Sequence, residues 1–252
     1  MNIKSYKPLF EIDTYVLSTS KVELAEIENI CDFRCGIDGP PIFYEAVLDS
    51  RVETYVIIEL LKKNKKNIIS CSDINELTNK LEIMLKGYKI KILLNYRVKG
   101  FVVEGRCSMS MDYLQVVLGR SVKDLNKDNF STFLQEFTSI LGHELVHRAQ
   151  VMKAKYGKIP YLVKGVSEEE REINYFSNKK EIMAYAWQIV ETISMNNFLP
   201  NDILRLLKTN SETKLIAGGI VLQKYHSLFT SSSKSLKLLY KYMYLYITQR
   251  MV

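Results

Sequence analysis

Residues 129–155 carry the clearest periodic pattern in this chain. Apolar side chains recur there at steps of one, three and four residues, which places them in one stripe along an α-helix. The stripe consists of Phe133, Leu134, Phe137, Ile140, Leu141 and Leu145. Gly157 and Pro160 follow it, and both residue types are common just beyond a helix end. The sequence therefore predicts one long amphipathic helix.

Three short runs before this helix have a different pattern. Segments 89–96, 100–104 and 113–118 are rich in Val, Ile, Leu and Tyr, and turn residues separate them. Such runs are typical of successive strands of a small sheet. Together with the long helix they predict an α+β fold.

Further helices are predicted on both sides of these elements. They cover 52–62, a segment from Ser72 or Asp73 to about residue 86, 178–197, and two helices within 202–250 that the polar run 230–233 separates. The acidic stretch within 164–174 is predicted to be a loop or an exposed helical turn.

Length and composition limit the classes of protein to consider. The chain has 252 residues, 47% hydrophobic and 25% charged, which excludes a disordered or low-complexity protein. We expect an N-terminal α/β support region over 1–95, a core over 96–200, and a basic helical region over 201–252 packed on that core. The sequence does not indicate an oligomeric state.

The sequence shows no targeting or membrane-spanning segment. No stretch approaches the roughly 20 apolar residues of a membrane span, and residues 1–10 lack the apolar core of a secretion signal. Four cysteines, Cys31, Cys35, Cys71 and Cys107, are too sparse for a disulfide framework. We therefore expect reduced thiols and a cytoplasmic location.

The net charge of +7 is concentrated near the C-terminus. After Asn201 there are eight basic residues and only two acidic ones. A solvated helical face explains this excess most simply. A nucleic-acid surface is the alternative, but no base-reading module is visible, so we do not expect a nucleic-acid partner.

The long helix contains the motif His143-Glu144-Leu145-Val146-His147. Residues four apart differ by about 40° around an α-helix and by about 6 Å along it, so His143 and His147 share one face. Both imidazoles can then reach one Zn²⁺ at ~2.0–2.1 Å, and Glu144 can take a proton from the metal's water. The chain has only three histidines, and two of them stand in this motif.

A catalytic zinc needs a third protein ligand and an open position for water. The remaining histidine, His226, lies 79 residues beyond His147, so an acidic ligand is favoured. Glu181 is the first choice, because it lies on the next predicted helix, where a rigid element positions a ligand better than a loop. The acidic run 168–172 and Glu191 remain alternatives.

The motif and the sheet before it resemble the zincin metallopeptidases. The downstream phrase from Tyr175 to Ala186, with Glu181 and Ala184, is similar to the E-x-x-A-x-A helix of small zinc-peptidase-like proteins of tailed bacteriophages. The resemblance implies a zincin-like fold and a gluzincin-type site with zinc on His143, His147 and Glu181. It also implies hydrolysis of a peptide bond in a viral or host protein, with Glu144 as general base.

Two further roles follow from this resemblance. Zincins place an edge strand beside the cleft to pair with an extended substrate, and segment 113–118 is the expected strand. A donor to the oxyanion is also needed, for which His226 and Tyr185 are candidates. The alternative to an enzyme is a catalytically silent zincin-fold structural or interaction protein, such as a phage virion component.

Overall fold

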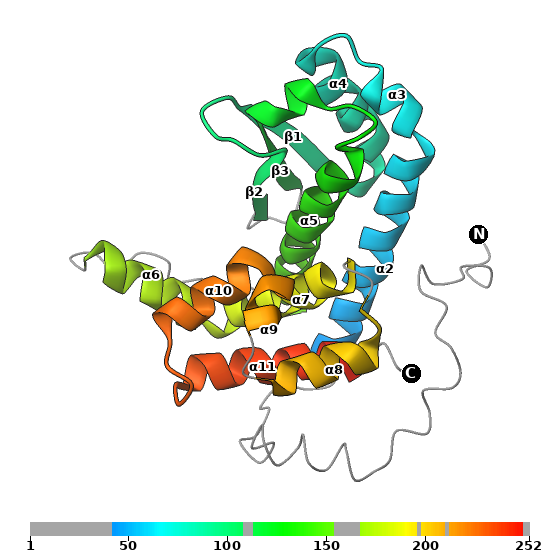
Figure 1. Cartoon of the computed structure of the whole chain (residues 1–252). Coiled ribbons are helices and arrows are strands. Elements are labelled where there is room, and N and C mark those ends of the chain that lie inside the picture. Colours follow the sequence, from blue (N-terminus) through cyan, green and yellow to red (C-terminus); the bar gives the residue numbers. More distant parts are fainter. Residues whose placement is uncertain (1–41, 108–112, 154–166, 196–197, 210–211, 249–252) are drawn as a thin grey trace. The chain divides into compact units, whose positions relative to one another are not determined.

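The computed structural model describes residues 42–107, 113–153, 167–195, 198–209 and 212–248 (Figure 1). These residues form helices and one three-stranded sheet, which confirms the predicted α+β class. Their contacts divide them between two compact units, one from Gly39 to Arg171 and one that contains Glu172 to Val252. Residues 1–10, Cys31, Cys35, Gly157 and Pro160 lie outside the described residues. The predicted division into 1–95, 96–200 and 201–252 stays a prediction.

The unit from Gly39 to Arg171 combines helices with the sheet. Its elements are α2 (Ile42–Lys63), α3 (Lys65–Ile69), α4 (Ile74–Leu85), η3 (Lys86–Tyr88), β1 (Ile90–Asn95), β2 (Val102–Cys107), β3 (Leu114–Gly119), η4 (Arg120–Asp124), α5 (Phe130–Lys153) and the start of α6 (Glu168–Ser177). The predicted strands and the long helix are thus present with small shifts of their ends, and α2 begins ten residues before the predicted helix.

The three strands do not follow their order in the chain. β3 lies between β1 and β2, parallel to β1 with Ile92 opposite Val116, and antiparallel to β2 with Gly105 opposite Val116. The expectation that segment 113–118 is an edge strand is therefore wrong. Four of the six β3 residues are hydrophobic and buried, as a central strand covered on both faces requires.

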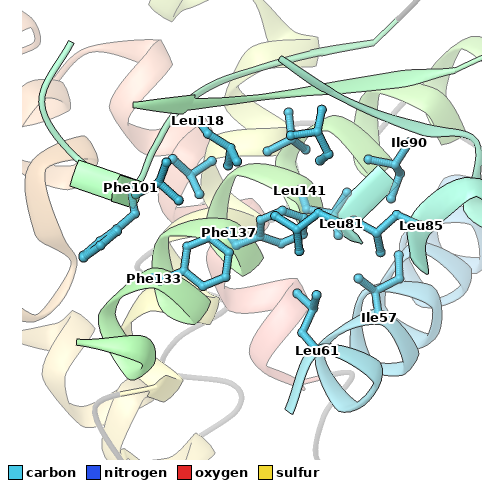
Figure 2. Close-up of a cluster of buried hydrophobic side chains, with 14 of the residues drawn as sticks. Ile57, Leu61, Leu81, Leu85, Ile90, Phe101, Leu118, Phe133, Phe137 and Leu141 are labelled. Carbon is cyan, nitrogen blue, oxygen red and sulfur yellow. The ribbon is translucent and has the colours of Figure 1, made fainter. Parts of the chain in front are cut away.

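One hydrophobic cluster joins α5 to the sheet and the earlier helices (Figure 2). α5 contributes Phe133, Phe137 and Leu141, all fully buried. They meet Ile57 and Leu61 of α2 together with residues of α4, β1 and β3. The predicted apolar stripe of α5 is thus the face that packs on the core. Polar side chains can occupy the other face of the helix.

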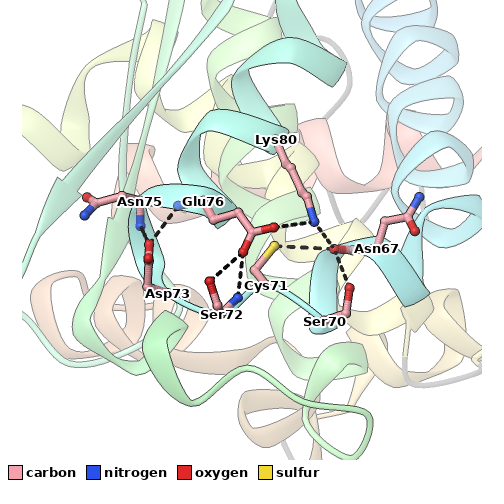
Figure 3. Close-up of polar contacts among 8 residues, drawn as sticks. All are labelled: Asn67, Ser70, Cys71, Ser72, Asp73, Asn75, Glu76 and Lys80. Carbon is pink, nitrogen blue, oxygen red and sulfur yellow. Dashed lines mark hydrogen bonds and ion pairs between the residues drawn. The ribbon is translucent and has the colours of Figure 1, made fainter.

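The start of α4 is fixed by side chains that bond to backbone groups (Figure 3). Asp73 is the N-cap, and its Oδ1 accepts from the amides of Asn75 at 2.7 Å and Glu76 at 2.9 Å. The Glu76 carboxylate pairs with Lys80 at 2.8 Å and accepts from Ser72. These donors, Lys80 first, lower the pKa of Glu76 to about 2. Of the two residues that the sequence offered as the N-cap of α4, Asp73 is therefore the one that caps it.

The second unit is helical throughout its described part. It contains the rest of α6, then α7 (Lys179–Met195), α8 (Pro200–Lys208), α9 (Glu212–Ala217), α10 (Gly219–Leu228) and α11 (Lys234–Thr248). α7 packs against α8, α10 and α11, and ten of its seventeen residues are buried. A helix buried on this scale is the core of its unit.

The prediction of two helices within 202–250 is wrong, because the described part of this segment contains four. α9 and α10 are separate because Gly219 has a φ of 71°, a left-handed conformation that glycine adopts at little cost. The acidic stretch is also more ordered than expected, since residues 168–177 form α6, which buries none of its side chains. No helix among the described residues is long and apolar enough to cross a bilayer.

Candidate functional site

His143 and His147 lie one turn apart on α5, and both side chains are buried. Their Nε2 atoms are 3.0 Å apart, and the two ring planes meet at 78°. The two ε nitrogens therefore face the same point, as the four-residue spacing predicts. A pair of imidazole nitrogens converging in a buried position can supply two ligands to one metal ion.

Gln150 holds the second imidazole from behind. Its Oε1 lies 3.0 Å from His147 Nδ1, and its side chain is buried. An amide oxygen only accepts hydrogen bonds, so Nδ1 of His147 carries the hydrogen and donates it to Gln150. Nε2 of His147 then presents its lone pair, which is the tautomer that a metal ligand needs. Gln150 was not predicted from the sequence. Its position three residues after His147 places both side chains on one face of the helix, and this spacing could have indicated the contact.

The removal of this outer hydrogen bond gives a first prediction. If His143 and His147 bind zinc, as the sequence predicts, Gln150→Ala should weaken that binding roughly 10- to 100-fold, because His147 loses the partner that orients its ring. Gln150→Glu keeps an acceptor for Nδ1 and is expected to retain most of the affinity. Competition with a chromophoric chelator measures both values. Equal zinc affinity in Gln150→Ala and the wild type would contradict this role.

Glu144 points toward strand β2. A Cβ built on Gly105 would lie 2.9 Å from Glu144 Oε1 and 2.8 Å from Cγ2 of Ile140, so only a glycine fits at this point of the strand without displacing a neighbour. Among the described residues β2 pairs with β3 alone. The Glu144 carboxyl group is buried and lies beside an edge strand of the sheet.

Glu136 fixes the start of that strand on the same helix. Its Oε2 accepts from the backbone amides of Phe101 at 2.8 Å and Val102 at 3.0 Å. One carboxylate oxygen thus satisfies two backbone donors. Two turns of α5 separate Glu136 from Glu144, so the helix that carries the motif also anchors β2.

Cys107 ends β2 close to Glu144. Burial, followed by the charge of Glu144, raises the pKa of the Cys107 thiol to about 12, and Arg148 opposes this shift. The thiol is therefore neutral at physiological pH, and neither described cysteine, Cys71 or Cys107, is part of a disulfide. Arg148 forms an ion pair with Glu53 of α2, which ties α5 to α2 one residue after His147.

Glu181 belongs to the unit that contains residues 172–252, whereas His143 and His147 belong to the other unit. It lies in the first turn of α7, and its side chain is buried. By contrast, residues 168–170 are exposed, Glu172 pairs with Lys224 at 2.7 Å, and Glu191 is half-buried. A buried carboxylate needs hydrogen bonds or a cation, so burial favours Glu181 among the carboxylates proposed from sequence.

The two candidate oxyanion donors both have partners within their own unit. Nε2 of His226 lies 2.7 Å from the Tyr240 hydroxyl, and burial, together with the charge of Lys214, lowers the pKa of His226. The Tyr185 hydroxyl lies 3.3 Å from that of Tyr175. Burial is the main cause of the raised pKa of Tyr175, followed by Tyr185 and Glu181. Both candidates are thus already engaged in side-chain hydrogen bonds.

Comparisons with protein-family models, with curated proteins and with solved structures found no match for this chain. The feature of this chain that bears most on function is the buried pair of imidazoles on α5, with Gln150 behind one ring and Glu144 directed at β2.

Proposed function

We propose that this chain is a zinc-dependent peptidase with a zincin-like core. In this proposal His143, His147 and Glu181 hold the metal, and Glu144 is the general base. The observation that carries it is the 3.0 Å separation of the two buried Nε2 atoms, with the hydrogen of His147 directed to Gln150. All three proposed ligands are buried side chains of kinds that hold metal ions.

The donor set fits zinc and its catalytic use. Two imidazole nitrogens and one carboxylate leave a fourth position open, which is the pattern of catalytic rather than structural zinc. When bound, zinc polarises the scissile carbonyl and lowers the pKa of a coordinated water to about 7. A site of four cysteines or histidines would instead be closed to substrate.

Glu144 has the position and chemistry of a general base. Its carboxylate takes the proton of the attacking water and delivers it to the leaving amine. The Glu144 side chain is buried, so bulk water screens the interaction of its carboxylate with the proton only weakly. These two proton transfers are the part of the reaction that the protein itself performs.

Strand β2 takes the substrate-pairing role that we had expected of segment 113–118. It is an edge strand among the described residues, and Gly105 brings its backbone against Glu144. An extended peptide that adds to this edge forms main-chain hydrogen bonds along β2. The scissile bond then passes next to the general base.

Metal analysis of the purified protein tests this proposal. We expect about one zinc per chain in the wild type, because two imidazoles and a carboxylate bind zinc tightly enough to retain it through purification. His143→Ala should lose that zinc. His226→Ala is the matched control, since it removes the histidine outside the motif and should keep the metal. Elemental mass spectrometry on protein prepared without chelators gives the three values.

Two outcomes contradict the proposal. One is folded wild-type protein that takes up no stoichiometric zinc even after zinc is added. The other is loss of zinc in His226→Ala together with retention in His143→Ala, which would move the site to the other histidine. Circular dichroism of each variant shows whether it is folded.

A further inference from the structure

Strand β2 lies along one face of α5 and is held there at two points (Figure 1). At the start of the strand, Glu136 accepts hydrogen bonds from two backbone amides. Further along, Gly105 lies against Ile140 and Glu144. The three helix residues are spaced four apart, so they share one face of α5. Glu136 and the proposed general base thus contact the same strand from the same face of one helix.

The spacings along the helix and along the strand match. Glu136 and Glu144 are about 12 Å apart along the helix axis, at 1.5 Å per residue. Val102 and Gly105 are about 10 Å apart along the strand, at roughly 3.3 Å per residue. A shift of one residue would bring a charged neighbour of Gly105 to the place where only a glycine fits. The two contacts together therefore fix the register of β2 on α5.

The start of β2 departs from regular strand geometry. In a regular antiparallel strand successive amides point to opposite edges, so the acceptor that Phe101 and Val102 share marks a bend. The bend follows Gly100, which has a φ of 101°, and it precedes an irregularity in the pairing with β3 between Val102 and Glu104. Irregularities of this kind re-aim a strand and are common beside active sites. The Glu136 carboxylate thus holds the bend that directs the rest of β2.

These contacts limit where a peptide can pair with β2. The amides of Phe101 and Val102 donate to Glu136, so an added strand takes its amide donors only from the residues after Val102. That part of β2 carries Gly105 and lies against Glu144. Pairing register decides which residue of one strand lies opposite which residue of the next. The position of β2 therefore decides which peptide bond reaches the base.

We propose that Glu136 is a positioning residue that selects the scissile bond of a peptide paired with β2. This inference rests on the proposed function, because it takes β2 as the substrate-pairing strand and Glu144 as the general base. Glu136 does not touch the reacting atoms in this proposal, and it acts through the strand that it holds. Its loss should change where a peptide is cleaved and how tightly it binds, and should leave the metal in place.

Two substitutions of Glu136 in the full-length protein test this role. Glu136→Ala removes the acceptor, so we expect cleavage of a library peptide to spread from one bond to its neighbours. KM should rise roughly tenfold, the scale of a hydrogen bond to a charged group, with a smaller change in kcat, because ground state and transition state lose the same binding. Glu136→Gln keeps an oxygen that can accept from both amides and should keep the wild-type cleavage position. Mass spectrometry of the products identifies the cleaved bonds.

Glu82→Ala is the matched control. The Glu82 carboxylate also accepts from a strand amide, that of Ile92 at 3.3 Å, but Ile92 belongs to β1, at the other edge of the described sheet. Its removal should leave both the cleaved bond and KM unchanged. Zinc content should keep its wild-type value in every variant, and urea unfolding measures how much stability each one loses.

Hydrogen exchange tests the contact without any substrate. The amides of Phe101 and Val102 should exchange faster in Glu136→Ala than in the wild type, because they lose their acceptor, and Glu136→Gln should protect them again. Glu136→Asp keeps the charge on a side chain one methylene shorter, so it should lose the protection of at least one amide and should also spread the cleavage. This variant provides the test if Glu136→Ala does not fold.

The outcomes distinguish the two proposals. If the wild type cleaves the library and Glu136→Ala cuts the same bonds with the same KM, the positioning role is wrong and the proposed function stands. Equal spreading of cleavage in Glu82→Ala also overturns the positioning role, because any loosening of the sheet would then have the same effect. If the wild type cleaves no peptide, both proposals fail together.

Discussion

Glu144→Gln is expected to leave zinc bound and to reduce peptide-bond hydrolysis about 10²- to 10⁴-fold, the usual contribution of a general base. Glutamine matches the shape of glutamate but cannot accept the proton of the attacking water. His143 and His147 keep their positions on α5 in this variant, so the metal should remain. The measurements are zinc content and the rate of cleavage of a quenched fluorescent peptide library.

A surface variant controls for the loss of one carboxylate. Glu59 lies on α2 and pairs with Lys62 at its surface, so Glu59→Gln should keep both zinc and activity. Equal cleavage rates in Glu144→Gln and the wild type would rule out Glu144 as the base. Zinc-loaded wild-type protein that cleaves no member of the library would favour the catalytically silent structural protein instead.

Gly105→Ala is expected to have the second large effect, on stability and activity together. The added methyl group would lie within 3 Å of Ile140 Cγ2 and Glu144 Oε1, closer than side chains pack. Overpacking of this kind typically costs about 1–3 kcal/mol. Because Glu144 is one of the groups that must move, we expect the cleavage rate to fall more than the loss of folded protein explains.

Gly87→Ala is the matched control for that substitution. Gly87 has no atom within 4 Å of its added Cβ and does not adopt a left-handed conformation. The change should be neutral or should stabilise the protein by about 0.4–1 kcal/mol. Urea unfolding measures both free energies. If Gly105→Ala proves as stable and as active as Gly87→Ala, then β2 does not pack against Glu144 as described.

The elements that local pattern determines were predicted well from sequence. Helix α5, the cap of α4 and the two histidines of the motif depend on spacings within a few residues, which periodicity and capping rules describe directly. The convergence of His143 and His147 is in this class, because one helical turn is enough to bring their rings together.

Features that depend on contacts between distant parts of the chain were not predicted from the sequence. The strand order is one such feature, since the position of segment 113–118 between β1 and β2 follows from tertiary pairing. Its almost continuous apolar run was a usable sign of a central strand. The ring contact of Tyr175 with Tyr185 joins two helices, and no spacing rule indicates it.

Two local signals were present and overlooked. Ser167 and Glu170 form a reciprocal cap at the start of α6, with the Glu170 carboxylate accepting from the Ser167 amide at 2.9 Å and the Ser167 hydroxyl accepting from the Glu170 amide at 3.1 Å. This spacing is the capping box of a helix start. The glycine pair at 218–219 likewise marks the break between α9 and α10.

The burial of α7 has a consequence for how this chain tolerates mutation. The same seventeen residues supply the core of their unit and carry Glu181, the proposed third ligand, so in the proposed function folding and metal binding depend on one short stretch of sequence. Exposed positions of α6 are free to drift, because surface changes there cost little. In α7 a substitution must preserve this packing, so we expect α7 to tolerate fewer substitutions than α6 does.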